Sequence, residues 1–84
     1  MTQTVYSAAG TGPLELDARG LNCPLPILKL KKVLNGQAAG ARVRLLATDP
    51  GSLKDVEAFC AQTGNLLEEA AASGGEFHFI VRKA

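Results

Sequence analysis

Apolar and polar residues alternate in three segments of the chain, and a period of two is typical of strands with one buried face. These segments are "LELDA" at 14–18, "ARVRLLAT" at 41–48 and "EFHFIVRKA" at 76–84. A fourth segment, "NLLEEAAAS" at 65–73, has a weaker strand pattern, because its alanines also suit a helix. Two glycines separate it from the last segment, and glycine pairs favour turns. The pattern therefore predicts four strands.

Two other segments repeat their apolar residues every three to four positions, which indicates helices. The first covers residues 24–36 and ends at Gly36, and the second covers residues 53–64 and ends at Gly64. Ser52, directly before the second helix, is expected to be its N-cap. The apolar lines consist of Ile27, Leu30 and Leu34 in the first helix, and of Leu53, Val56, Phe59 and Cys60 in the second.

The order of the elements, β-α-β-α-β-β, predicts the fold class. Right-handed crossovers place both helices over the same face of the sheet. We therefore expect an α/β (α+β) two-layer sandwich, in which a four-stranded mixed sheet carries two helices on one face. Residues 14–84 are expected to form this one domain, and residues 1–13 a flexible N-terminal tail. A chain of 84 residues buries only about 60% of its unfolded surface, so we expect its chemistry at the surface.

Composition and charge exclude several classes of function. The net charge of +1 provides no strong field for nucleic acid or for an anionic membrane. No apolar run approaches the ~18 residues of a membrane span, and the first residues lack the basic start and apolar centre of a secretory signal. We expect a cytoplasmic protein, in a reducing compartment where cysteines are free thiols.

Cys23 stands at the start of the first helix, between Asn22 and Pro24. If the helix begins at Pro24, Cys23 is the N-cap, and Pro24 suits the first helical position because its φ angle is preset. Pro26 is tolerated because it lies in the first turn. The N–H groups of Leu25 and of Cys23 itself then remain to face the sulfur. The positive end of the helix dipole is expected to lower the pKa of the Cys23 thiol from its free value of about 8.5.

The other potentially reactive residues of the chain limit the reactions in which Cys23 can take part. The single histidine, His78, lies in the middle of a predicted strand, where it is expected to be a half-exposed residue rather than a catalytic base. There is no C-x-x-C motif, and the two cysteines and one histidine do not have the spacing of a zinc site. Cys60 is expected to be a buried small hydrophobe. What remains is one exposed thiol, which suits a carrier that accepts a group and hands it on.

The stretch "LDARGLNCPLPILKLKK" resembles the signature of the TusA/SirA-like sulfur-carrier family, in which a C-P-x-P motif begins the first helix. The stretches "LLATDPGSLKDVEAFCAQTGN" and "FHFIVRK" also resemble this family, so that the resemblance covers residues 14–83. It implies the fold predicted above, and it implies that Cys23 accepts sulfane sulfur as a persulfide. It further implies a donor protein, either a cysteine desulfurase or a rhodanese, and an acceptor protein. No cofactor and no metal are expected, and the activity is that of a transferase only in a loose sense.

Other motif residues take their expected roles from the same resemblance. Gly20 and Asn22 are expected to shape the turn that delivers the cysteine, and Asp49 matches the family's acidic-proline turn, although a plain turn-forming role is an alternative for it. The position between the motif prolines is Leu25 here, whereas members that serve tRNA thiolation typically carry an acidic residue. This difference favours sulfur oxidation or general sulfur transfer over tRNA thiolation.

The basic face of the first helix leaves a second hypothesis open. Lys29, Lys31 and Lys32 resemble the partner-docking surface of the family, although such a face is also typical of a merely solvated helix. The alternative function is a non-catalytic regulatory module that binds RNA or protein through these lysines. For the carrier we expect a monomer, no membrane contact and no direct binding of nucleic acid. The alternative to a monomer is a dimer contact on the open face of the predicted sheet, which carries His78 and Ile80.

Overall fold

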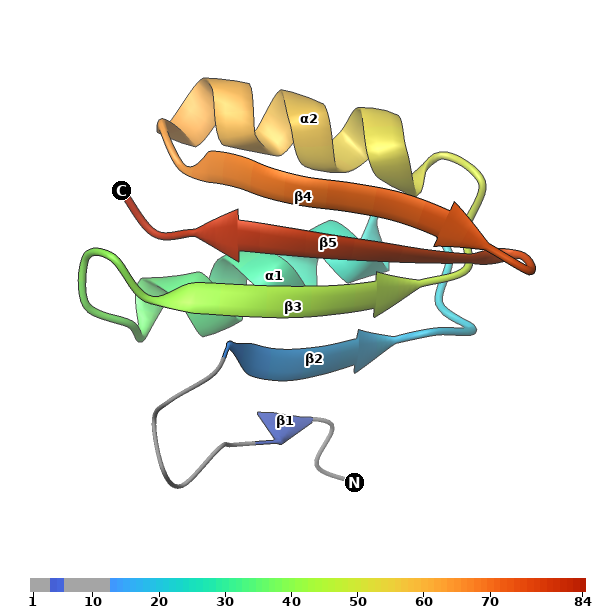
Figure 1. Ribbon diagram of the computed structural model, residues 1–84, viewed down its shortest axis with the longest axis horizontal. Coiled ribbons are helices and arrows are strands. Elements are labelled where there is room, and N and C mark those ends of the chain that lie inside the picture. Colours follow the sequence, from blue (N-terminus) through green and yellow to red (C-terminus); the bar gives the residue numbers. More distant parts are fainter. Residues whose placement is uncertain (1–3, 6–12) are drawn as a thin grey trace.

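The computed structural model describes residues 4–5 and 13–84, and its main elements form two layers (Figure 1). The predicted order of strands and helices is confirmed, with boundaries within two residues of those expected. No helix among the described residues is long and apolar enough to span a membrane. The elements are β2 (Leu14–Ala18), α1 (Leu25–Asn35), β3 (Arg42–Ala47), α2 (Ser52–Thr63), β4 (Leu66–Ser73) and β5 (Glu76–Arg82).

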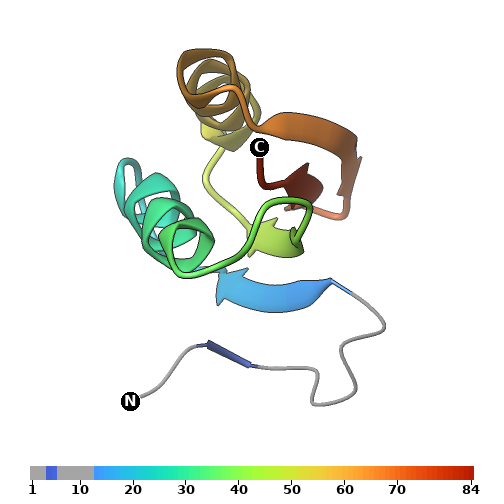
Figure 2. The same cartoon turned by 90° about the vertical axis from the view of Figure 1, so that its left-hand side faces the viewer.

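The strands form one mixed sheet in the order β1-β2-β3-β5-β4, in which β1 is Thr4–Val5. Strands β2 and β3 are parallel, and β5 is antiparallel to both of its neighbours, β3 and β4. Both helices lie over the same face of this sheet (Figure 2). The predicted two-layer sandwich is therefore confirmed. Because β2 and β3 are parallel, the loops that follow them emerge at the same edge of the sheet, where α1 and α2 begin.

A short strand was not predicted. β1 (Thr4–Val5) pairs antiparallel with β2, with Thr4 opposite Leu16 and Val5 opposite Glu15. It adds a fifth strand to the four expected, within the segment that we expected to be a tail. The rest of that predicted tail, residues 1–3 and 6–12, lies outside the described residues. Two residues carry too little alternation to be recognised as a strand from sequence, so this strand depends on its pairing with β2.

The core is built from rows of residues that lie in register across the sheet. Leu16, Leu45 and Phe79 form one row over β2, β3 and β5, and each is at most 1% exposed. Ala18 and Ala47 lie beside each other at the carboxyl ends of β2 and β3 and are fully buried. The helices cover these rows with the buried residues Leu30 and Leu34 of α1, and Val56, Phe59 and Cys60 of α2. The alternation in the sequence predicted these faces.

The ends of the helices differ in part from the prediction. Gly64 ends α2 in the left-handed conformation, at φ +83°, and its N–H donates to the carbonyl oxygen of Cys60. At the other end of α2 the prediction was wrong, because Gly51 is the N-cap and Ser52 is the first helical residue. The Ser52 side chain is buried, and its Oγ has no hydrogen-bond partner among the described residues. Leu53, in the first turn of α2, was expected in the buried stripe but is 40% exposed.

The hairpin between β4 and β5 is closed by Gly74 and Gly75, with φ values of +57° and +83°. Positive φ at both central residues is the geometry of a type I′ turn, which matches the twist of paired strands. Within β4, the register shifts between Leu67 and Glu69, which is the mark of a β-bulge. The carboxylate of Glu68, at this bulge, accepts a hydrogen bond of 2.8 Å from Nε of Arg42.

The residue that follows β5 contacts the end of α1. Nζ of Lys83 donates a hydrogen bond of 3.0 Å to the carbonyl oxygen of Leu34, in the last turn of the helix. A cation at a helix C-terminus is favoured by the dipole. Ile80 lies on the sheet face opposite the helices, as expected, but it is buried to 3% exposure rather than open.

Candidate functional site

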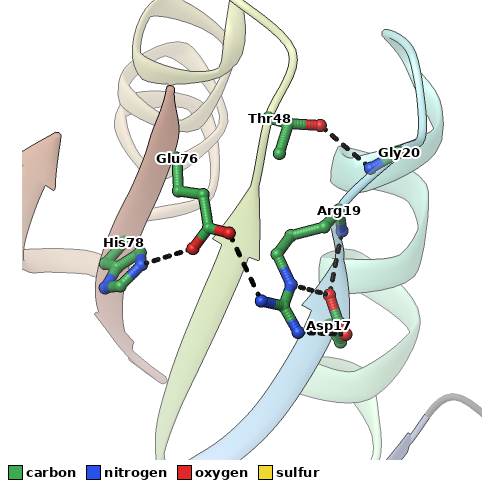
Figure 3. A network of polar contacts seen from close by, with 6 residues as sticks. All are labelled: Asp17, Arg19, Gly20, Thr48, Glu76 and His78. Atoms are coloured by element: carbon green, nitrogen blue, oxygen red, sulfur yellow. Dashed lines mark hydrogen bonds and ion pairs between the residues drawn. The ribbon is translucent and has the colours of Figure 1, made fainter. Parts of the chain in front are cut away.

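The loop between β2 and α1 carries the predicted functional cysteine, and its course depends on Gly20. Gly20 has φ +81°, a conformation that is costly for residues with a side chain. Its N–H donates a hydrogen bond of 2.9 Å to Oγ1 of Thr48, at the end of β3 (Figure 3). Gly20 therefore lies at a left-handed position of this turn, and its N–H attaches the loop to the neighbouring strand.

Arg19 attaches the same loop to the sheet through ion pairs (Figure 3). Its Nε lies 2.9 Å from Oδ1 of Asp17, and its Nη1 lies 3.4 Å from Oε2 of Glu76. Glu76 in turn contacts Nε2 of His78 at 3.3 Å. The hydrogen bonds from Arg19 hold the pKa of the Asp17 carboxyl below its ordinary value. The pKa of Glu76 is also lowered, first by its hydrogen bond with His78 and then by Arg19.

Cys23 lies one residue farther from α1 than predicted. The N-cap is Pro24, and the helix begins at Leu25. The N–H of Leu25 donates a hydrogen bond of 2.8 Å to the carbonyl oxygen of Asn22, closing a turn around Cys23 and Pro24, which are joined by a cis peptide bond. The expectation that the N–H of Leu25 faces the sulfur was therefore wrong, because this donor is already used. Asn22 contributes its backbone carbonyl oxygen to this turn.

Pro26 lies in the first turn of α1 and is buried, whereas Pro24 and Cys23 are exposed. The missing N–H of a proline costs nothing here, because the first N–H groups of a helix have no partner within the helix. The buried Pro26 ring joins the apolar side of α1, which also contains Leu30 and Leu34. The motif thus places one proline against the core and leaves the thiol outside, which is the arrangement required of an accessible nucleophile.

Cys23 lies beside a groove between α1 and α2. The groove has a volume of about 210 Å³ and is formed by Cys23, Pro24 and Ile27 on one side and by Asp55, Ala58, Phe59 and Gln62 on the other. Its volume is below the ~300 Å³ at which pockets for whole small-molecule ligands begin, and its wall is largely apolar. It therefore has room for one side chain of a partner beside the thiol.

The electrostatic surroundings of Cys23 are opposite to those predicted. The pKa of the Cys23 thiol is raised above its ordinary value, mainly by hydrogen bonding to the Asp55 carboxylate. Desolvation and the negative charges of Asp55 and Asp49 raise this pKa further. The prediction of a lowered pKa was wrong for two reasons. The sulfur does not occupy the N-cap, and the neighbouring helix brings carboxylates to it.

Asp49 lies near Cys23, as the sheet topology predicts, and it also forms its own turn. Its Oδ2 accepts a hydrogen bond of 2.9 Å from the N–H of Gly51, and its carbonyl oxygen accepts one of 3.0 Å from the N–H of Ser52. Asp49 thus forms its own turn, and its negative charge also acts on the Cys23 thiol.

The predicted docking lysines share one helix but differ in exposure. Lys31 and Lys32 are exposed on α1, and Lys29 is half-buried. None of the ion pairs found between residues 13 and 84 involves these three side chains. Their charge therefore faces solvent without a carboxylate partner in this part of the chain.

The other two groups considered from sequence lie where they were expected. Cys60 is a free cysteine at 6% exposure in the core, and burial raises the pKa of its thiol. His78 is exposed in the middle of β5 and contacts Glu76. It does not line the groove that contains Cys23. Neither group takes part in the geometry around the exposed thiol.

Asp55 and Thr48 were missed by the sequence analysis. Asp55 lies in the first turn of α2, where an acidic residue is common because it complements the helix dipole, so nothing in its sequence position indicated a role at Cys23. The available signal was topological, because the parallel pair β2–β3 brings the starts of both helices to one edge. Thr48 directly follows β3 and could have been found in the same way.

Known proteins share both the sequence and the fold of this chain. The family model of the sulfurtransferase TusA matches residues 14–83. A sulfur carrier protein TusA of Allochromatium vinosum is 57% identical over 70 residues, which are 83% of this chain and 92% of that protein. A putative sulfur carrier protein of Neisseria meningitidis serogroup A is 48% identical over 67 residues, covering 80% of this chain and 90% of the relative.

A solved structure has a similar arrangement of strands and helices. The SirA-like protein of Desulfitobacterium hafniense superposes with a TM-score of 0.71 at 24% identity. The matched region covers 81% of this chain and 93% of that protein. The likeness supports the α+β sandwich described above, and the sequence matches support the family.

Proposed function

The chain belongs to the TusA family of sulfurtransferases, and from this premise we propose that it is a sulfur carrier that relays sulfane sulfur as a persulfide on Cys23. The observation that carries this proposal is the exposed free thiol of Cys23, held at the start of α1 beside a groove large enough for one side chain. The buried Cys60 is inaccessible to a protein donor. Cys23 is therefore the cysteine that a partner can reach.

The transfer step needs no oxidant or reductant. The sulfur of Cys23 forms a bond to the outer sulfur of a donor persulfide, and the sulfur–sulfur bond of the donor breaks. The donor sulfur leaves as a thiolate and takes up the proton that Cys23 gives up. Cys23 then carries the persulfide, and the reverse chemistry hands the same sulfur atom to an acceptor. One neutral sulfur atom moves in each step, which is why the protein is acceptor first and donor second.

The partners of such a carrier are a protein that donates sulfur and a protein that accepts it. A cysteine desulfurase or a rhodanese suits the first role, since both form persulfides, and a reducing cytoplasm suits the free thiol. The side chain between the motif prolines, Leu25, is 47% exposed and uncharged. An apolar contact at this point favours partners in sulfur oxidation or general sulfur transfer over those of tRNA thiolation.

Intact-protein mass spectrometry under non-reducing conditions tests the proposal. The wild type, Cys23→Ser and Cys60→Ala are incubated with a cysteine desulfurase and cysteine, and separately with a rhodanese and thiosulfate. We expect the wild type and Cys60→Ala to gain one sulfur atom that a reductant removes, and Cys23→Ser to gain none. Sulfur uptake by Cys23→Ser equal to that of the wild type, or no uptake from either donor while Cys23 still reacts with an alkylating reagent, would refute the relay.

A further inference from the structure

The groove beside Cys23 contains a carboxylate that the relay chemistry does not require. Asp55 lines this groove together with Cys23, and the two residues come from the starts of different helices. The Asp49 carboxylate nearby has a partner of its own in the N–H of Gly51. Among the described residues, no side chain and no backbone N–H outside the helix donates a hydrogen bond to the Asp55 carboxylate, and this carboxylate is the main cause of the raised pKa of the Cys23 thiol. The negative charge of Asp55 is therefore not engaged by another hydrogen-bond donor and affects the Cys23 sulfur.

Loading changes the charge at this point of the groove. An empty Cys23 is a neutral thiol at neutral pH, because its neighbours disfavour the thiolate. A persulfide is a stronger acid than a thiol, so the loaded residue is an anion. Each loading step therefore brings a negative charge beside Asp55, and each unloading step removes it. The negative charge of Asp49 acts on Cys23 in the same direction.

We propose that Asp55 tunes the sulfur relay, keeping empty Cys23 as a thiol and repelling the loaded persulfide so that its sulfur is readily passed on. This inference rests on the proposed function and adds that Asp55 favours release of sulfur over loading. In the exchange, Cys23 in its thiol form and a donor persulfide anion become the Cys23 persulfide anion and a donor thiol. The proton moves from Cys23 to the donor sulfur, and the negative charge moves to Cys23. Because Asp55 is itself negative, it disfavours the arrival of this charge at Cys23. It favours the reverse step, in which the sulfur and the charge pass to an acceptor.

The chain offers a matched control for Asp55. Glu57 lies on the same helix, is exposed, and does not line the groove. Glu57→Gln removes the same charge as Asp55→Asn and leaves the surroundings of the sulfur unchanged. Asp55→Glu keeps the charge, and Asp55→Ser is a second neutral variant in case Asp55→Asn does not fold. All variants carry Cys60→Ala, so that Cys23 is the one thiol measured.

The first measurement is the rate of alkylation of Cys23 by iodoacetamide as a function of pH. We expect its midpoint to fall by about half a pH unit in Asp55→Asn and Asp55→Ser, which corresponds to removing one nearby charge in watery surroundings. Glu57→Gln and Asp55→Glu are expected to keep the midpoint of the parent. This measurement reports on the thiol alone and requires no sulfur transfer.

The second measurement is the loaded fraction at equilibrium with cysteine persulfide and cysteine, read by intact-protein mass spectrometry at pH 7.5. We expect the equilibrium constant for loading to rise about threefold in Asp55→Asn, the factor that corresponds to half a pH unit, and to stay unchanged in Glu57→Gln. Equal values in all variants, or equal effects of Asp55→Asn and Glu57→Gln, would overturn the role of Asp55. If the small persulfide loads Cys23 and neither protein donor does, the proposed relay fails, while the comparison of Asp55 with Glu57 still decides this inference.

Discussion

The N–H of Gly20 and the hydroxyl of Thr48 are joined by a hydrogen bond of 2.9 Å that connects the cysteine loop to the end of β3. These residues are 28 positions apart in the chain. Arg19 adds ion pairs with Asp17 and Glu76. The loop is therefore attached to β2, to the end of β3 and to β5. The position of Cys23 relative to α2 follows from these attachments.

Thr48→Val removes this hydrogen bond and keeps the shape of the side chain. We expect a loss of about 1 kcal/mol in the free energy of unfolding, the usual net contribution of one hydrogen bond. Urea denaturation measures it, and Thr48→Ser, which keeps the hydroxyl, is expected to stay close to the wild type. Equal stability of the valine and serine variants would show that the bond contributes nothing.

Gly20→Ala places a side chain on a residue with φ +81°. Space is available around it, since no atom beyond the adjacent residues lies within 4 Å of the added Cβ, so the cost is conformational and about 1–2 kcal/mol. Gly36→Ala is the control, because Gly36 has φ −89° and the added Cβ meets Val33 O at an ordinary 3.6 Å. We expect Gly36→Ala to be neutral or slightly stabilising in urea denaturation. A smaller loss from Gly20→Ala than from Gly36→Ala would contradict this account of the turn.

The ion pairs of Arg19 predict a dependence of stability on pH. The folded pKa of Asp17 is lowered, so its contribution is fully present above its ordinary value of 3.8 and disappears as the pH falls through the lowered value. Glu76 behaves in the same way relative to 4.5. We expect Arg19→Met to lower the free energy of unfolding at pH 7 and to make little difference at pH 2.

The matched control for Arg19→Met is Arg44→Met. Arg44 is exposed on β3 and takes part in none of the ion pairs found between residues 13 and 84. Urea denaturation of both variants at pH 7, 4 and 2 separates a specific ion pair from a general loss of charge. If the difference between Arg19→Met and the wild type persists unchanged at pH 2, the ion pairs are not its cause.

The lysines of α1 distinguish the carrier from the alternative binding module. Lys32→Glu reverses an exposed charge, and we expect it to slow sulfur uptake from a protein donor about tenfold at low salt, with the difference shrinking at high salt. Uptake from cysteine persulfide should not change. Arg44→Glu makes the same change of charge on the other face of the molecule and should keep the wild-type rate. The alternative module would instead be indicated if Cys23→Ser retained full function and Lys32→Glu abolished RNA binding.

Much of the fold could be predicted because the strand pattern reports directly on burial. Val43, Leu45 and Ala47 alternate with polar residues in the sequence, and all three are fully buried. The parallel pairing of β2 and β3 also followed from the helix between them. Thr4–Val5 could not be predicted, since two residues form a strand only through pairing with β2. The exposure of Leu53 could not be predicted either, because a residue of an apolar stripe need not be buried when it lies at the end of a helix.

The candidate site was predicted in part. The accessibility of Cys23 followed from its place at a helix start, and the burial of Cys60 followed from the stripe on α2. The environment of the thiol could not be predicted from its neighbours in sequence, because Asp55 reaches it from another helix. The turn closed between Asn22 and Leu25 also moved the helix start by one residue, and this removed the sulfur from the capping position.

The bulge at Glu68 bears on how copies of this protein meet one another in a crowded solution. β4 is an edge strand of eight residues, and a long regular edge is a template for pairing with another chain. The register shift interrupts this edge, and Glu68 adds a charge at the interruption, where Arg42 and Arg82 hold it. A second copy that added to β4 would lose its register at this point. The bulge therefore protects the protein against edge-to-edge aggregation.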